Sequence, residues 1–167
     1  QSVDFAASDR PLGRPALQAA GLAQFPTAIG GVVMVDNVPG IASDKLKLDA
    51  AVLGSIYTGA IKQWNDPALR ALNPDLALPA LPIVPVFRAD GSGTSFVFTT
   101  YLSKLHPLFK TTHGATSTLN LPSGKGGRSS TEVVRLVRET PGAIGYVDYA
   151  VTTDLGLPTM RLKNQWG

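Results

Sequence analysis

The chain has 167 residues, of which 44% are hydrophobic and 16% charged, and its formal net charge is +3. This length and composition predict one folded domain with its own hydrophobic core. The basic residues are scattered, which argues against nucleic-acid binding. The absence of cysteine excludes disulfides, thiolate catalysis and cysteine metal sites. No run of the sequence approaches the roughly 20 apolar residues that cross a membrane.

Apolar runs in the first part of the chain predict two strands. They cover residues 3–7 and 25–35, and a turn over residues 8–15 follows the first of them. The segment Asn-Val-Pro-Gly at residues 37–40 predicts a second turn.

Two helices are then expected. Apolar side chains recur at helical spacing over residues 49–58. Those available for the core are Ala51, Leu53, Ile56 and Tyr57. A second helix is predicted to begin at Asp66 and Pro67 and to end near Leu72, because aspartate caps helices and proline suits the first helical position.

The second half of the chain continues the alternation of strands and helices. The expected elements are a strand over residues 81–87, a helix over 94–105, a loop over 111–127, a helix over 129–139 and strands over 143–149 and 159–163. Ser129 and Glu132 have the spacing of a capping box. Alternating strands and helices predict an α/β fold, in which ligands gather at the carboxyl ends of strands.

Residues 88–98, with the sequence RADGSGTSFVF, form the most informative segment. A turn from a strand into a helix directs free N–H groups and the positive end of the helix dipole at whatever lies in front of it, which favours an anion. Arg88 adds a planar guanidinium that suits phosphate or carboxylate oxygens. The alternative is an ordinary turn, in which Ser92 caps the helix and Arg88 pairs with Asp90 at the surface.

Other candidate motifs are weaker. His106 and His113 lack a carboxylate or cysteine cluster, which argues against a metal site. Residues 124–130, GKGGRSS, do not match a phosphate-binding loop, and either line a site with backbone amides or form a flexible basic loop. Four aromatic residues are expected to pack in the core or at the surface rather than to stack on a ligand. They are Tyr57, Trp64, Tyr101 and Tyr149.

Residues 88–102, RADGSGTSFVFTTYL, resemble the signature of the periplasmic phosphate-binding proteins that serve ABC phosphate transporters. Further segments resemble this family in the same order along nearly the whole chain. They are VDFAASDRPL at 3–12, FPTAIGGVV at 25–33, LGSIYTGAIKQWND at 53–66 and TPGAIGYVDYA at 140–150. The resemblance implies a single lobe of a type II periplasmic-binding-protein fold, an α/β fold with a mixed sheet flanked by helices.

The same resemblance implies how the chain is divided. All 167 residues form one domain, in which residues 1–12 are a crossing strand with an acidic ligand segment and residues 13–167 are a second-lobe-like α/β domain. The N-terminal and C-terminal parts of the first lobe are expected to be absent. With the start at Gln1 and no visible signal peptide, this indicates a fragment, a split protein or an independent single-lobe relative.

The family's function follows from the resemblance. It implies non-catalytic binding of inorganic phosphate, with no cofactor, in an exported protein of the periplasm or the extracellular space. A membrane permease of an ABC phosphate transporter is the implied partner, and a missing lobe or a second copy of the chain is a further candidate partner. The site residues carried over are Arg88 as a direct ligand, Asp90 as its support, and Ser92, Gly93 and Thr94 as further contacts.

Asp9 is also implied as a ligand, although a carboxylate repels an anion. Phosphate at neutral pH retains a proton and sulfate does not, so Asp9 would accept a hydrogen bond from phosphate and leave sulfate mismatched. The alternative is that Asp9 only forms a turn.

Two functions other than phosphate binding are compatible with the sequence. An enzyme with Ser92 as nucleophile or Arg88 acting on a phosphoryl group is disfavoured, because no histidine or lysine base lies near Ser92 in sequence. A protein-interaction or split-protein subunit on the same fold, with weak or no phosphate binding, is the main alternative.

Overall fold

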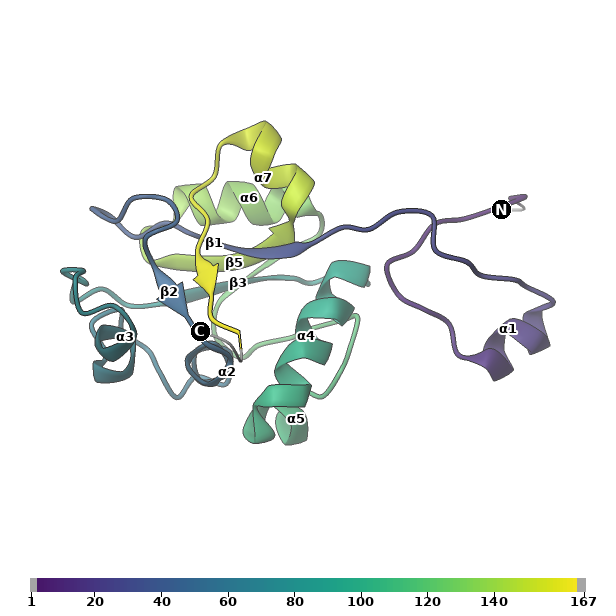
Figure 1. Cartoon of the computed structure of the whole chain (residues 1–167), viewed down its shortest axis with the longest axis horizontal. Helices are drawn as coiled ribbons and strands as arrows, with labels where there is room; N and C mark the ends of the chain where they lie inside the picture. The colour runs from purple at the N-terminus through teal and green to yellow at the C-terminus, as the bar shows by residue number, and fades with distance from the viewer. Residues whose placement is uncertain (1–2, 165–167) are drawn as a thin grey trace.

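A computed structural model describes residues 3–164, which contain a four-stranded sheet with helices on both faces (Figure 1). The strands are β1 (Val32–Asp36), β3 (Val84–Arg88), β4 (Lys125–Gly127) and β5 (Ala143–Asp148), in the order β1-β5-β3-β4. β1 is antiparallel to β5, whereas β3 is parallel to both β5 and β4. The predicted mixed sheet is therefore confirmed. A smaller parallel pair joins β2 (Lys47–Leu48) to β6 (Arg161–Leu162).

Helices α6 (Ser130–Glu139) and α7 (Tyr149–Leu155) lie on one side of the sheet (Figure 1). The other side carries α2 (Ala50–Tyr57), α4 (Gly93–Leu105) and α5 (Pro107–Thr112), with α3 (Pro67–Leu72) beyond them. None of the described helices is both long and apolar enough to cross a bilayer. The two faces of the sheet thus have separate apolar cores.

The side chains of β5 alternate between these two cores, as a strand requires. Val147 packs with Val133 and Val137 of α6, whereas Tyr146 belongs to the opposite core. Gly145 faces α6, where an added Cβ would lie 2.9 Å from Cγ2 of Val137. The missing side chain therefore allows α6 to approach the sheet closely.

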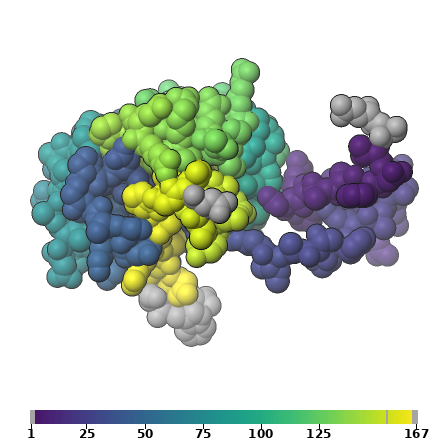
Figure 2. All heavy atoms as spheres, turned by 90° about the horizontal axis from the view of Figure 1, so that it is seen from above, coloured from purple at the N-terminus to yellow at the C-terminus, as the bar shows by residue number. Residues whose placement is uncertain are grey.

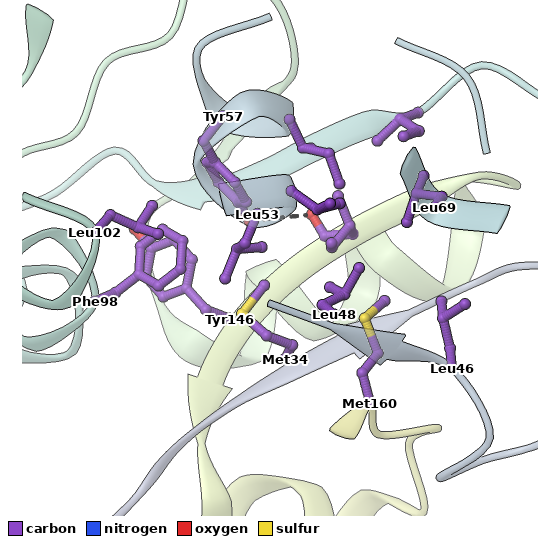
Figure 3. Packing of buried hydrophobic residues seen from close by; sticks show 14 of the residues in the cluster. Met34, Leu46, Leu48, Leu53, Tyr57, Leu69, Phe98, Leu102, Tyr146 and Met160 are labelled. Carbon is purple, nitrogen blue, oxygen red and sulfur yellow. Dashed lines mark hydrogen bonds between the residues drawn. The ribbon is translucent and has the colours of Figure 1, made fainter. Parts of the chain in front are cut away.

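The larger core contains an aromatic cluster (Figure 3). The ring of Tyr146 stacks on Phe98 with centroids 4.2 Å apart, and Tyr57 meets Phe98 edge-on at 4.8 Å. Trp64 is fully buried and donates from Nε1 to the carbonyl of Gly142 over 3.0 Å. The predicted packing roles of Tyr57 and Trp64 are therefore confirmed.

Residues 3–31 form an arm that extends away from the sheet (Figures 1 and 2). The arm includes α1 (Arg14–Ala20), which has no buried residue. The strand predicted over residues 3–7 is wrong, and of the strand predicted over residues 25–35 only the end forms, as β1. An extended segment needs a partner for its backbone groups, and β5 provides one only from Val32 onward.

The helices predicted around residues 49–58, 67–72, 94–105 and 129–139 are all present. Asp49 and Asp66 cap α2 and α3 as their sequence positions predicted. Ala51, expected in the core, is instead exposed. The capping box is altered, because Glu132 accepts from the N–H of Arg128 rather than from that of Ser129.

Five of the described elements were not predicted, namely α1, β2, α5, β4 and α7. Helix α5 begins at Pro107 with the Nδ1 of His106 accepting from Phe109, and α7 begins after Asp148, which caps it. Strand β4 lies within the segment predicted to be a loop and pairs with β3. Strands β2 and β4 depend on partners that are distant in sequence, and α5 begins at an uncommon histidine cap.

Asp36, at the end of β1, is only 4% exposed, and this burial raises its pKa to about 6, while a hydrogen bond from Val38 acts in the opposite direction. The pKa of Asp36 in the folded protein lies above its ordinary value of 3.8. The contribution of Asp36 to the free energy of unfolding is therefore fully present below pH 3.8 and is lost as the pH rises through about 6. We expect Asp36→Asn to raise the free energy of unfolding at pH 8 by up to about 3 kcal/mol, and by progressively less toward pH 4.

Urea unfolding between pH 4 and pH 8 measures this difference. Asp75→Asn, a change at an exposed position, is the matched control and should leave stability unchanged. An Asp36→Asn advantage that is constant with pH would contradict the assignment of the titration to Asp36.

Candidate anion-binding site

A hollow of about 500 Å³ lies where β3 and β5 reach their carboxyl ends. This edge was predicted for a ligand site in an α/β sheet. The hollow brings together five of the six residues predicted for the site, from the arm, the end of β3 and the start of α4. Its lining consists of Ala7, Ser8, Asp9, Arg88, Gly91, Ser92, Gly93, Thr94, Ser130 and Asp148.

Arg88 ends β3 with its guanidinium held by two neighbours. Its Nε and Nη2 each donate to one carboxylate oxygen of Asp90 over 2.6 Å, and its Nη1 donates to Ser130 Oγ over 3.1 Å. The Arg88 side chain is 15% exposed and that of Asp90 34% exposed. The pair is therefore half-buried and bidentate, unlike the exposed ion pair considered as the alternative.

The hydrogen bonds from Arg88 hold the pKa of Asp90 below its ordinary value, and those to Asp90 raise the pKa of Arg88. Beneath them, Tyr146 accepts from the N–H of Arg88 over 3.2 Å and lies 2.7 Å from Ser95 Oγ. Burial raises the pKa of Tyr146. The phenol that accepts from the Arg88 backbone therefore stays neutral, and the guanidinium supplies the positive charge at the hollow.

The amino end of α4 forms a second wall. Ser92 caps the helix by accepting from the N–H of Ser95 over 3.3 Å, and its own N–H is taken by the carbonyl of Ser117 over 2.9 Å. The N–H of Ser92 is therefore engaged within the protein, so that only its hydroxyl remains as a donor for a ligand, and the contact of Ser92 with phosphate stays a prediction. In the described part of the chain, the N–H groups of Gly93 and Thr94 have no hydrogen-bond partner, and both residues line the hollow.

Asp9 approaches this wall from the arm. A Cβ added to Gly93 would lie 2.6 Å from Cβ of Asp9 and 3.1 Å from its backbone nitrogen. Next to it, the guanidinium of Arg10 lies 5.1 Å from the ring centroid of Phe96, and its Nη1 is 3.5 Å from Ser117 Oγ. Asp9 thus lies against the helix terminus, and its side chain is exposed.

Ser130 and Asp148 were not predicted for the site. Ser130 is the first residue of α6, and the alternation of β3 places Arg88 on the same face as Val86, which packs against that helix. Asp148 ends β5 and accepts from the N–H of Ala150. The GKGGRSS segment was the sequence signal for Ser130, whereas nothing in the sequence singled out Asp148.

The histidines lie away from the hollow. His106 follows the last residue of α4, about 20 Å along the helix axis from Ser92. Its Nε2 lies 3.3 Å from Ser55 Oγ, and its Nδ1 accepts from the N–H of Phe109. Among the described side chains, no group of three histidine, cysteine, aspartate or glutamate residues is placed to hold a metal ion.

Ligands of open α/β sheets bind at the carboxyl ends of the strands, which is where this hollow lies. The PBP superfamily domain matches residues 1–162, and the chain belongs to this superfamily. It is 45% identical over its whole length to the phosphate-binding protein PstS of Haemophilus influenzae and 42% identical to that of Pasteurella multocida. It spans 50% and 48% of these relatives, about half of their length.

Solved structures share the fold. A phosphate-binding protein from Stenotrophomonas maltophilia superposes with a TM-score of 0.70 at 22% identity, over 94% of this chain and 49% of the other. An ABC-type phosphate transport receptor from Vibrio cholerae gives a TM-score of 0.59 at 20% identity, over 93% of this chain and 55% of that one. The resemblance to phosphate-binding proteins and the single-lobe fold are therefore confirmed.

Proposed function

We propose that this chain binds inorganic phosphate without chemical change and forms half of a solute receptor for ABC-type phosphate uptake. The observation that carries the proposal is the gathering of the Asp9 and Asp148 carboxylates, a half-buried guanidinium and two helix N–H groups without a partner among the described residues around one hollow. The names of its relatives, which are phosphate-binding proteins, support the same ligand.

The chemistry of the hollow favours phosphate over sulfate. Arg88, Gly93 and Thr94 offer donors to oxygens that carry no proton, and Asp9 offers an acceptor. At neutral pH only phosphate retains a proton that it can donate to Asp9, whereas sulfate has none and would place an unprotonated oxygen against the carboxylate. Asp90 stays paired with Arg88 and supports the guanidinium.

The arm favours completion of the site by a second body. Its apolar side chains Phe5, Phe25 and Ile29 are 90%, 73% and 102% exposed, respectively. The relatives are about twice as long as this chain, which supports a first lobe as the body that covers the arm. In that assembly the receptor acts in the periplasm or the extracellular space and delivers phosphate to a membrane permease.

The same arm favours a second candidate function, a protein-interaction or split-protein subunit with weak or no phosphate binding. Exposed apolar surface of this kind marks a site for another protein. The two candidates differ in whether the hollow binds phosphate in the isolated chain.

Calorimetric titration of the chain with phosphate, and separately with sulfate, tests the proposal. We expect binding of phosphate in preference to sulfate. Asp9→Asn should reduce this preference by about tenfold or more, since a hydrogen bond involving a charged group contributes about 1.5–3 kcal/mol, with the unfolding free energy unchanged because Asp9 is exposed.

Asp4→Asn is the matched control, because Asp4 is exposed in the same arm and does not line the hollow. Absence of phosphate binding by the wild-type chain would reject the proposal for this chain and leave the interaction function. A preference for phosphate that survives in Asp9→Asn would show that Asp9 does not detect the phosphate proton.

A further inference from the structure

Arg88 has five N–H groups, of which three are already engaged. Asp90 accepts one hydrogen bond from Nε and one from Nη2, and Ser130 accepts one from Nη1. One N–H on Nη1 and one on Nη2 are left for a ligand. The direction of this remaining pair depends on the plane of the guanidinium, and therefore on both neighbours.

We infer that Ser130 is a positioning residue, whose hydroxyl holds the Nη1 side of Arg88 so that its remaining donors face the hollow. This role rests on the proposed binding of phosphate at Arg88. Asp90 holds only the edge of the guanidinium that carries Nε and Nη2. With Asp90 alone, the Nη1 side of the group can tilt about that edge. Ser130 adds a third contact from a different element, α6.

The backbone fixes Ser130 at this place. Gly127 of β4 pairs with Arg88 in the parallel ladder, and its carbonyl accepts from the N–H of Ala89 over 2.8 Å. Ser129 then caps α6 by accepting from the N–H of Glu132 over 3.0 Å. Because the connection from β4 to α6 is short, the pairing of β4 with β3 places Ser130 beside the guanidinium of Arg88.

A neutral partner suits this position. A second carboxylate at Ser130 would further offset the charge of Arg88, whereas a hydroxyl accepts from Nη1 and leaves that charge available to an anion. The hydroxyl proton of Ser130 has no acceptor among the described residues, and Ser130 lines the hollow. The same side chain can therefore donate to an oxygen of the bound anion.

The first test uses the ligand-free chain, so that it does not depend on phosphate binding. Nuclear magnetic resonance of isotope-labelled protein measures the rotation rate of the Cζ–Nη1 bond of Arg88. We expect at least about fivefold faster rotation in Ser130→Ala and a rate near that of the wild type in Ser130→Thr, which keeps the hydroxyl. Thr131→Ala is the matched control, since Thr131 is exposed on the same helical turn and its hydroxyl has no partner among the described residues.

The second test is phosphate titration of the same variants. Ser130→Ala should weaken binding about tenfold, while Ser130→Thr and Thr131→Ala stay within about twofold of the wild type. An unchanged Nη1 rotation rate in Ser130→Ala would overturn the inference, and so would an unchanged affinity in a chain that binds phosphate. If the wild-type chain does not bind phosphate, the proposed function fails, and the rotation rates still decide whether Ser130 positions Arg88.

Discussion

Arg88→Lys is expected to weaken phosphate binding by at least roughly 30-fold. Arg88 is held through three of its donors and keeps two for the ligand. A lysine ammonium is a single charged centre, which cannot bind both oxygens of Asp90 in parallel and still present two donors to the anion. The loss of one hydrogen bond to a charged group corresponds to about 2 kcal/mol, which is the basis of this factor.

Calorimetric titration with phosphate measures the effect of Arg88→Lys. Arg128→Lys is the matched control, because it makes the same change at an exposed residue outside the hollow. It retains the backbone hydrogen bond to Glu132. Equal affinities for Arg88→Lys and the wild type would rule out the bidentate contact.

Gly93→Ala is expected to reduce phosphate affinity by about tenfold or more and to reduce the preference over sulfate as well. The added Cβ would lie 2.6 Å from Cβ of Asp9, closer than such atoms pack, so Asp9 must move away from the helix terminus. The arm has few contacts to resist this shift, because all its described side chains except that of Leu17 are exposed. The unfolding free energy should change by less than about 1 kcal/mol, since alanine favours a helix.

Titration with both anions and urea unfolding together test this expectation. Gly31→Ala is the control, because the same methyl group there would lie 3.9 Å from Cβ of Tyr149, an ordinary contact. Weak binding with a large loss of stability would mean that Gly93→Ala disturbs the lobe itself, and normal binding would mean that Asp9 does not contribute from this position.

The local signals that predicted elements correctly are those in which a residue acts on its immediate neighbours. Asp66 and Pro67 begin α3, Ser129 caps α6, and Ser92 caps α4. Each of these satisfies N–H groups two or three residues further along the chain, so no distant contact is needed. The turn that carries Arg88 was predictable for the same reason.

The predictions that failed concern segments whose structure depends on distant partners. The arm residues 3–7 and 25–31 have apolar sequences typical of strands but no paired neighbour among the described residues. Strand β4 forms within a glycine-rich segment because β3 lies beside it. An apolar pattern indicates that a segment can be buried, but only the fold provides the surface that buries it.

The sequence by itself determined the class of fold, the strand–turn–helix at Arg88 and the resemblance to phosphate-binding proteins, because these depend on local spacing and on residues close together in the chain. Only the tertiary structure decided how the site is assembled. It paired β3 with β4 and so placed Ser130 on Arg88, engaged the N–H of Ser92 with Ser117, and brought Asp9 against Gly93. These contacts join residues from 25 to 84 positions apart, and their formation depends on the packing of the whole lobe rather than on local preference.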